Sequence, residues 1–173
     1  MKRRKAKELL EQACGYPTTL IACPDFVLST LAMSVTELLE EAIAPLGLRL
    51  RHYRLVRLLY FEGPQPQSSL RDALGVDRTT VVSLVDYLEQ RGLAKRERSP
   101  HDRRAYIITL TPKGGRLAKK ATALMATAEQ RMFAPLDGDE RRLLRQLSTR
   151  LLGNPGPIAE RHRSGQVASR RLP

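Results

Sequence analysis

Apolar residues recur at helical spacing through a long segment that begins near Pro24. The positions on this stripe are Phe26, Leu28, Leu31, Val35, Leu38, Leu39 and Ala42. Because side chains three and four residues apart share one face of an α-helix, this spacing predicts a long amphipathic helix. Pro45 and Gly47 should end it, since neither residue continues a helix well.

Three shorter helices are expected next, over about 50–61, 68–74 and 77–91, with the breaker "EGPQPQ" after the first. The last two lie only a few residues apart. Gly75 supplies a tight turn between them, and Asp77 is a suitable N-cap for the longer one. Two helices joined in this way form a helix-turn-helix pattern. Helix pairs joined through glycine are also common in other all-α proteins, so the pattern alone leaves both interpretations open.

The helix over 77–91 has two contrasting faces. Its apolar stripe consists of Val81, Leu84, Val85 and Leu88. The opposite face carries Arg78, Thr79, Val82, Ser83, Asp86 and Tyr87. Short polar side chains allow close approach to a DNA major groove, where arginine can address guanine and a threonine methyl can meet thymine. The alternative is an ordinary amphipathic surface helix.

Two strand-like segments, "GLAKRER" and "RAYIITL", predict a β-hairpin directly after this helix pair. A hairpin in that place, with the cationic turn "SPHDRR", is typical of a winged helix. Arg98, Arg103 and Arg104 would then clasp phosphates or enter a minor groove, where narrow A·T tracts favour an inserted guanidinium. Asp102 would hold an arginine at the base of the wing or cap the amides of the turn.

The expected fold is therefore mainly α with a small β-hairpin, a winged helix-turn-helix flanked by N- and C-terminal dimerisation helices. A helix should begin at Thr111 and Pro112 and run to about Phe133, and a capping-box pattern precedes a last helix over 141–152. The predicted organisation is a basic extension (1–23), a dimerisation helix (24–48), the DNA-binding domain (49–111), dimerisation helices (112–152) and a disordered basic tail (153–173).

The chain carries a formal net charge of +12 and has a pI near 10.4. Such a charge indicates a polyanionic partner, first nucleic acid and second an anionic membrane surface. Part of it is concentrated over 91–104, where six basic residues face two acidic ones. No stretch approaches the roughly 20 apolar residues of a membrane span, so we expect a soluble, cytoplasmic, nucleoid-associated protein without a membrane partner.

Few residues are suited to metal, redox or catalytic chemistry. Two cysteines and three histidines are too few and too scattered for a zinc site, so no metal or cofactor is expected. The sequence contains no glycine-rich phosphate loop after a strand and no spacing that suggests a Ser/His/Asp or Cys/His arrangement. These observations argue against an enzyme.

The segment "VDRTTVVSLVDYLEQRGLAKRERSPHDRRAYIITLTPKG" resembles the MarR family of bacterial transcriptional regulators. The L-x-x-x-G-L-x-x-R step and the D-x-R-x-x-x-x-x-L-T wing stand in register, and the likeness spans roughly 24–152. It implies a winged-helix homodimer that binds a pseudo-palindromic operator, often as a repressor, and often releases DNA on binding a small aromatic or apolar ligand.

The resemblance also suggests roles for particular residues. Asp102 and Arg104 match the wing motif, with Arg104 as the minor-groove residue. Thr79, Thr80 and Ser83 match recognition-helix positions that meet the major groove. Many relatives carry a basic residue at the position of Ser83, so more of the base or phosphate contact would pass to Arg78.

The residues themselves support self-association. The long first helix and the last helix carry more apolar surface than a small winged helix can cover, which favours a homodimer. A dimer would place its two recognition helices about one DNA turn apart.

Candidate sensing residues are few. A ligand anchor would have to come from Arg51, His52 or Arg54, or from the N-terminal segment; the alternative is that these side chains are solvated or face phosphates, with His52 a satisfied surface histidine. A thiol-based redox sensor is a further alternative, with Cys14 and Cys23 as the only thiols. Two other functional classes stay open: a non-specific architectural DNA-binding protein and a protein-interaction module.

Overall fold

The computed structural model describes residues 15–100 and 105–153. The described elements are, in order, α2 (Thr18–Ile21), α3 (Pro24–Ile43), the 3-10 helix η1 (Ala44–Leu46), α4 (Leu50–Glu62), β1 (Gln65–Pro66), α5 (Gln67–Leu74), α6 (Arg78–Gln90), β2 (Ala94–Arg98), β3 (Tyr106–Leu110), α7 (Pro112–Met132) and α8 (Gly138–Gly153). The mainly helical fold with a small antiparallel sheet confirms the predicted fold class. The chain divides into two compact units, and the division falls within α3, after Leu39.

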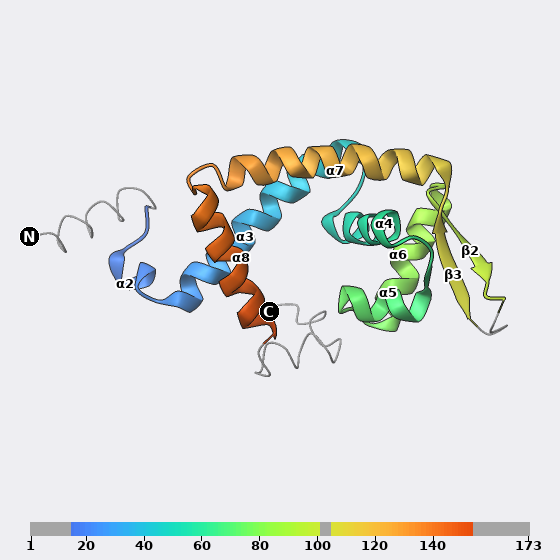
Figure 1. Cartoon of the computed structure of the whole chain (residues 1–173), viewed down its shortest axis with the longest axis horizontal. Helices are drawn as coiled ribbons and strands as arrows, with labels where there is room; N and C mark the ends of the chain where they lie inside the picture. The colour runs from blue at the N-terminus through green and yellow to red at the C-terminus, as the bar shows by residue number, and fades with distance from the viewer. Residues whose placement is uncertain (1–14, 101–104, 154–173) are drawn as a thin grey trace, which may run out of the picture. The chain divides into compact units, whose positions relative to one another are not determined.

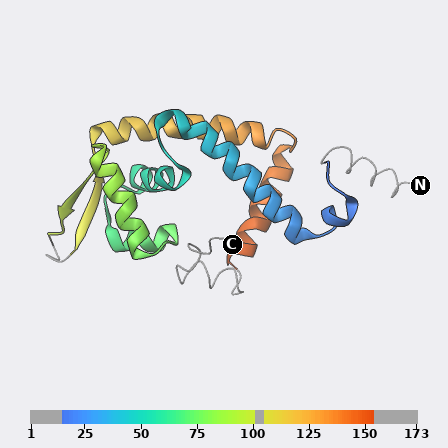
Figure 2. The same ribbon diagram turned by 180° about the vertical axis from the view of Figure 1, so that it is seen from behind.

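Helices α4, α5 and α6 of the second unit pack together and against the sheet, and α7 lies along α4 (Figures 1 and 2). The apolar stripe predicted for α6 faces this interior. The buried leucine, isoleucine and valine side chains of its core are Leu55, Val56, Leu59, Leu70, Val81, Leu84, Val85, Leu88, Leu93 and Ile108. Since each fully buried side chain of this size contributes about 1.5–3 kcal/mol, the core is the main source of stability for the helix-turn-helix.

The helix boundaries around the predicted turn follow local chemistry. Gly75 adopts φ +63°, a left-handed conformation that glycine accepts without strain, and so ends α5. Asp77 caps α6, because its Oδ1 accepts a hydrogen bond from the backbone N–H of Thr80 at 2.8 Å. At the start of α7 the hydroxyl oxygen of Thr111 accepts from the N–H of Gly114 at 3.1 Å. Both predicted caps are confirmed.

The sheet has three strands in the order β1-β3-β2, where the sequence predicted a two-stranded ribbon. The additional strand is β1, in which Gln65 pairs with Ile108 and Pro66 with Ile107, antiparallel to β3. Local patterning could not predict this two-residue strand, because it is defined only by its partner. A proline there is compatible with an edge strand, which has one side without ladder bonds.

Strands β2 and β3 form the predicted hairpin. Arg98 lies opposite Tyr106 at its outer end, and the N–H of Ser99 donates to the carbonyl of Ala105 at 3.0 Å. The wing residues Asp102, Arg103 and Arg104 lie outside the described residues, as do residues 1–14 of the predicted basic extension and the tail beyond Gly153.

The short helix α2 lies within the predicted basic extension (1–23), and one later helix boundary differs from expectation. Helix α8 starts at Gly138 rather than Arg141, after a reciprocal capping box: Glu140 N–H donates to Asp137 Oδ1 at 2.9 Å, and Asp137 N–H donates to Glu140 Oε2 at 2.9 Å. None of the described helices is long and apolar enough to cross a lipid bilayer.

The first unit leaves much apolar surface on α3 exposed. Leu28, Leu31 and Met33 are 54%, 48% and 65% exposed in the isolated chain. Tyr16 packs edge-to-face on Phe26, with 5.3 Å between ring centroids, and so closes α2 onto the start of α3. Leu28 and Leu31 of the predicted stripe are therefore exposed within one chain, while its other members are half-buried.

Candidate nucleic-acid interface

Helix α6 presents a polar ridge to solvent, because its other side is held in the core. Arg78, Thr79 and Ser83 are exposed on this ridge. The hydroxyls are short and the arginine stands at the first turn, an arrangement that can approach base edges in a major groove. Three of the predicted DNA-contacting residues therefore share one accessible surface.

Thr80, the fourth predicted residue on α6, is placed differently. It is half-buried, and its hydroxyl donates to Asp77 Oδ2 at 2.7 Å. The hydroxyl and backbone N–H of Thr80 both stabilise the carboxylate, which lowers the pKa of Asp77 below its ordinary value. The hydroxyl of Thr80 is thus engaged in the helix cap, and a negative charge stays fixed at the N-terminus of α6, where the helix dipole favours it.

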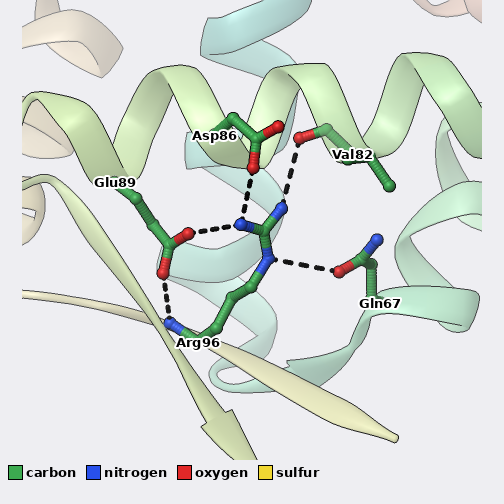
Figure 3. Close-up of polar contacts among 5 residues, drawn as sticks. All are labelled: Gln67, Val82, Asp86, Glu89 and Arg96. Atoms are coloured by element: carbon green, nitrogen blue, oxygen red, sulfur yellow. Dashed lines mark hydrogen bonds and ion pairs between the residues drawn. The ribbon is translucent and has the colours of Figure 1, made fainter.

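Arg96, on strand β2, joins the wing to the helix-turn-helix (Figure 3). Its Nη1 donates to Asp86 Oδ1 at 2.6 Å and to Glu89 Oε2, both on α6. Its Nη2 donates to the carbonyl of Val82 at 3.3 Å, and its Nε donates to Gln67 Oε1 on α5 at 3.4 Å. One guanidinium therefore contacts both helices of the pair.

This network changes the electrostatics of the polar ridge of α6. Asp86 and Glu89 would place two negative charges on the helix expected to approach DNA, and unpaired carboxylates there would repel phosphates. The half-buried guanidinium of Arg96 neutralises part of that charge and holds the carboxylates away from the ridge. Arg96 was not among the predicted site residues, although it is the final arginine of the L-x-x-x-G-L-x-x-R pattern, which was the available signal.

A concave surface of about 640 Å³ lies between α5, α6 and the wing strands. Its cationic lining residues are Arg71, Arg78 and Arg96. At the outer end of β2 the guanidinium carbon of Arg98 lies 5.3 Å from the centroid of the Tyr106 ring, a cation–π contact. Arginines from α5, α6 and β2 thus lie together on one side of the helix-turn-helix.

A second groove, of about 680 Å³, lies on the other side of α6. Its lining residues include Glu40, Arg51, His52, Ser83 and Tyr87. Two of the three predicted ligand anchors therefore share one groove. The third, Arg54, is exposed on α4 but does not line it.

The alternative reading of His52 as a surface histidine is wrong. The residue is only 7% exposed, and its Nδ1 accepts a hydrogen bond from the backbone N–H of Arg49 at 3.1 Å. Burial lowers the pKa of His52, and the positive charge of Arg51 lowers it further, while Glu40 opposes this shift. The neutral imidazole is the form that fits this place.

The residues considered for metal or thiol chemistry can be placed in the described part of the chain. No group of three or more histidine, cysteine or acidic side chains within residues 15–100 and 105–153 is arranged to hold a metal ion. Cys23 is exposed, and its thiol donates a weak hydrogen bond to the carbonyl of Thr19 at 3.3 Å. Cys14 lies outside the described residues.

Residues 46–105, which hold the helix-turn-helix and the start of the wing, match the model of the MarR family. The uncharacterised HTH-type transcriptional regulator YhbI of Bacillus subtilis is 30% identical over 112 residues, which cover 65% of this chain and 73% of YhbI. The chain belongs to the MarR family. MarR proteins are DNA-binding regulators rather than enzymes.

Solved MarR-family structures have the same architecture. CouR from Rhodococcus jostii RHA1, solved bound to p-coumaroyl-CoA, is 29% identical, with a TM-score of 0.68 and coverage of 79% of this chain and 96% of CouR. A MarR variant from E. coli complexed with operator DNA is 21% identical, with a TM-score of 0.69 and coverage of 73% of this chain and 91% of that one. At this identity the similarity shows a shared fold. The chain spans 51% to 73% of the length of the curated relatives it matches.

Proposed function

We propose that this MarR-family protein is a homodimeric repressor that binds a pseudo-palindromic operator and is released from it by a small-molecule ligand. The observation that carries the proposal is the exposed ridge of α6, on which Arg78, Thr79 and Ser83 stand beside two carboxylates whose charge Arg96 partly neutralises. Such a ridge suits base readout in the major groove, with the flanking arginines on phosphates.

The homodimer accounts for apolar surface that one chain leaves uncovered. The exposed leucines of α8 are Leu143, Leu147, Leu151 and Leu152, and α3 adds Leu28, Leu31 and Met33. An apolar area of this size would favour aggregation unless a partner covered it. A second copy is the simplest partner, and its two-fold symmetry would match a palindromic operator.

Ligand release is supported by the groove on the far side of α6. It brings Arg51 and His52, which could hold an aromatic or anionic effector, within reach of Ser83 and Tyr87 on the recognition helix. An effector bound there would act directly on the orientation of α6. CouR, which has the same fold, was solved with an aromatic thioester.

The test is fluorescence anisotropy on the DNA upstream of the protein's own gene, against a scrambled duplex of equal length and at several salt concentrations. A specific repressor should prefer the upstream DNA by roughly 10³-fold or more. Arg78→Ala should reduce that preference. The matched control is Lys119→Ala, which removes one exposed cation from α7 and should leave the preference unchanged.

Equal and steeply salt-dependent binding to both duplexes would instead identify a non-specific architectural protein. Little binding at moderate salt would identify a protein-interaction module. Once an effector that releases the DNA is found in an aromatic carboxylate and thioester screen, Arg51→Ala should weaken release, while Arg54→Ala on the same helix should not. Equal effects of the two variants would exclude the groove as the effector site.

A further inference from the structure

The C-terminal end of α6 is tied to the turn between α3 and α4. The Tyr87 hydroxyl donates a hydrogen bond to the carbonyl oxygen of Gly47. Nη1 of Arg91, just after the helix, donates to the same carbonyl at 2.7 Å and to the Tyr87 hydroxyl at 2.5 Å, and its Nη2 reaches the carbonyl of Leu46 at 3.3 Å. Two side chains from the end of the recognition helix thus hold two consecutive carbonyls, 40 to 45 residues earlier in the chain.

The turn is shaped to receive this guanidinium. Gly47 adopts φ +66°, a left-handed conformation, at the end of η1. A Cβ at this position would lie 2.7 Å from Arg91 Nη1, so a side chain there would displace the arginine. Carbonyls at the end of a helix lack intrahelical partners, and a guanidinium satisfies several of them because its donors are arranged in a fork.

The contacts of Tyr87 and Arg91 with the Leu46–Gly47 turn form a tether, and a buried ring packs against it. His52 stacks on Tyr87 with ring centroids 3.9 Å apart and planes inclined by only 5°. The ring of His52 is fixed in turn by the hydrogen bond from Arg49 N–H to its Nδ1. The phenol of Tyr87 is therefore held by its face and by its hydroxyl at once.

We propose that Arg91 and Tyr87 are positioning residues for operator recognition, fixing the C-terminal half of α6 to the Leu46–Gly47 turn. This inference rests on the proposed function, because it concerns the orientation in which the α6 ridge meets DNA. Arg96 holds the same helix from the wing side, so α6 is anchored by a guanidinium on each flank. Loss of either anchor lets the ridge tilt without removing any base contact.

The rival role for Arg91 is a direct contact with a DNA phosphate. The geometry favours the tether, because both terminal nitrogens of its guanidinium are engaged with carbonyls and the Tyr87 hydroxyl, and its Cζ lies 5.4 Å from the centroid of the Tyr87 ring. A phosphate contact needs only the positive charge. The tether needs both terminal nitrogens of the planar Arg91 guanidinium and the hydroxyl of Tyr87.

Tyr87→Phe and Arg91→Lys separate the two roles, because the first keeps the ring and the second keeps the charge. Each variant should bind the operator about tenfold more weakly, as expected for loss of one well-made hydrogen bond to a charged or polar partner. The slope of log affinity against log salt should stay unchanged in both, and the double variant should lose little more than the worse single one. Arg116→Lys, the same change at an exposed position on α7, is the control.

Amide hydrogen exchange of the free protein gives a readout without DNA. Both variants should exchange faster in the C-terminal half of α6 than wild type, while circular dichroism confirms that they are folded. Unchanged exchange in both variants would overturn the proposal. So would wild-type operator affinity in Tyr87→Phe and Arg91→Lys, or an Arg91→Ala variant whose salt slope falls by about one, the signature of a lost phosphate contact.

The two proposals fail in different ways. If wild type shows no preference for the operator over scrambled DNA, the proposed function fails, and hydrogen exchange alone then decides on the tether. If wild type prefers the operator but the variants neither loosen α6 nor bind more weakly, the proposed function stands and the positioning role is wrong.

Discussion

Arg96 and Glu89 contact each other at two points, one through the backbone and one through the side chain. Glu89 Oε1 accepts from the backbone N–H of Arg96 at 2.8 Å, while its Oε2 accepts from Arg96 Nη1. A single carboxylate on the recognition helix thereby fixes both the strand and the guanidinium. The wing and α6 should therefore behave as one rigid element.

Replacement of Arg96 by alanine should destabilise the protein by about 2 kcal/mol, because it breaks charge-assisted hydrogen bonds and leaves two carboxylates unpaired. Its side chain is 20% exposed, so solvent replaces these bonds only in part. The control is Lys95→Ala, the neighbouring residue in the exposed pair with Glu97, which should cost less than about 0.5 kcal/mol. Urea denaturation measures both, and equal losses would contradict the structural role of Arg96.

The adjacent glycines at the start of α7 should respond in opposite directions to alanine. A Cβ on Gly114 would lie 1.9 Å from the carbonyl oxygen of Leu93, so Gly114→Ala forces the backbone of α7 away from Leu93, the residue before β2. We expect a loss of about 3 kcal/mol for this overpacking. Gly115 has no heavy atom within 4 Å of the same position, and Gly115→Ala should stabilise the helix by about 0.5 kcal/mol. Thermal unfolding of the two variants tests the contrast.

Stability should fall as the pH drops below about 6.5, with His52 contributing to the loss. Burial, and next the charge of Arg51, lower the pKa of His52 from its ordinary value of 6.5 in the folded protein. The unfolded chain then binds more protons than the folded chain below that pH, so the free energy of unfolding decreases as the pH falls. Denaturation curves at pH 7.5 and pH 5 measure the change.

The control is His52→Asn, because the Oδ1 of asparagine takes the position of the imidazole Nδ1 and can still accept from Arg49 N–H, but does not titrate. Its stability should depend less on pH between 5 and 7.5 than that of wild type. The Asp77 carboxyl, whose pKa is lowered from 3.8, titrates below this window and does not interfere. An identical pH dependence in the variant would assign the effect to other groups.

A carboxylate at Leu147 should convert the dimer into monomers. Leu147 is 47% exposed in one chain, on the stripe of α8 that the proposed dimer covers. Burial of a glutamate in an apolar interface without a partner costs several kcal/mol, enough to separate the chains at micromolar concentration. Gln146→Glu introduces the same charge at the adjacent, exposed position and is the control. Sedimentation equilibrium distinguishes the outcomes, and a dimeric Leu147→Glu variant would rule out this face.

The arginines of the wing turn should differ in what they contribute to binding. Arg104→Ala should weaken operator binding by about 1–3 kcal/mol, as for one good minor-groove contact. Arg103→Ala should weaken operator and scrambled DNA alike, because a phosphate contact carries no sequence information. Undiminished operator affinity of Arg104→Ala in the anisotropy titration would remove this residue from the interface.

Elements with strong periodicity and local caps were predictable without coordinates. The buried stripe of α6 and its cap at Asp77 follow from side-chain spacing and from one hydrogen bond over three residues. Strand β1 was not predictable, because a two-residue strand exists only through its pairing with Ile107 and Ile108. The exposed ridge of Arg78, Thr79 and Ser83 follows from the helical period, whereas the engagement of the Thr80 hydroxyl by Asp77 required coordinates.

The amino-acid sequence by itself determined the order of the helices, the hairpin, the basic reading face and the family, because these depend on contacts within a few residues and on a motif in fixed register. Only the tertiary structure decided which charges are neutralised and which side chains hold α6 in place. Arg96 reaches Gln67, and Arg91 reaches Gly47, across separations of 29 and 44 residues. Contacts of that range are set by how the helices pack, so a sequence pattern can single out Arg96 but cannot name the partners that its side chain reaches.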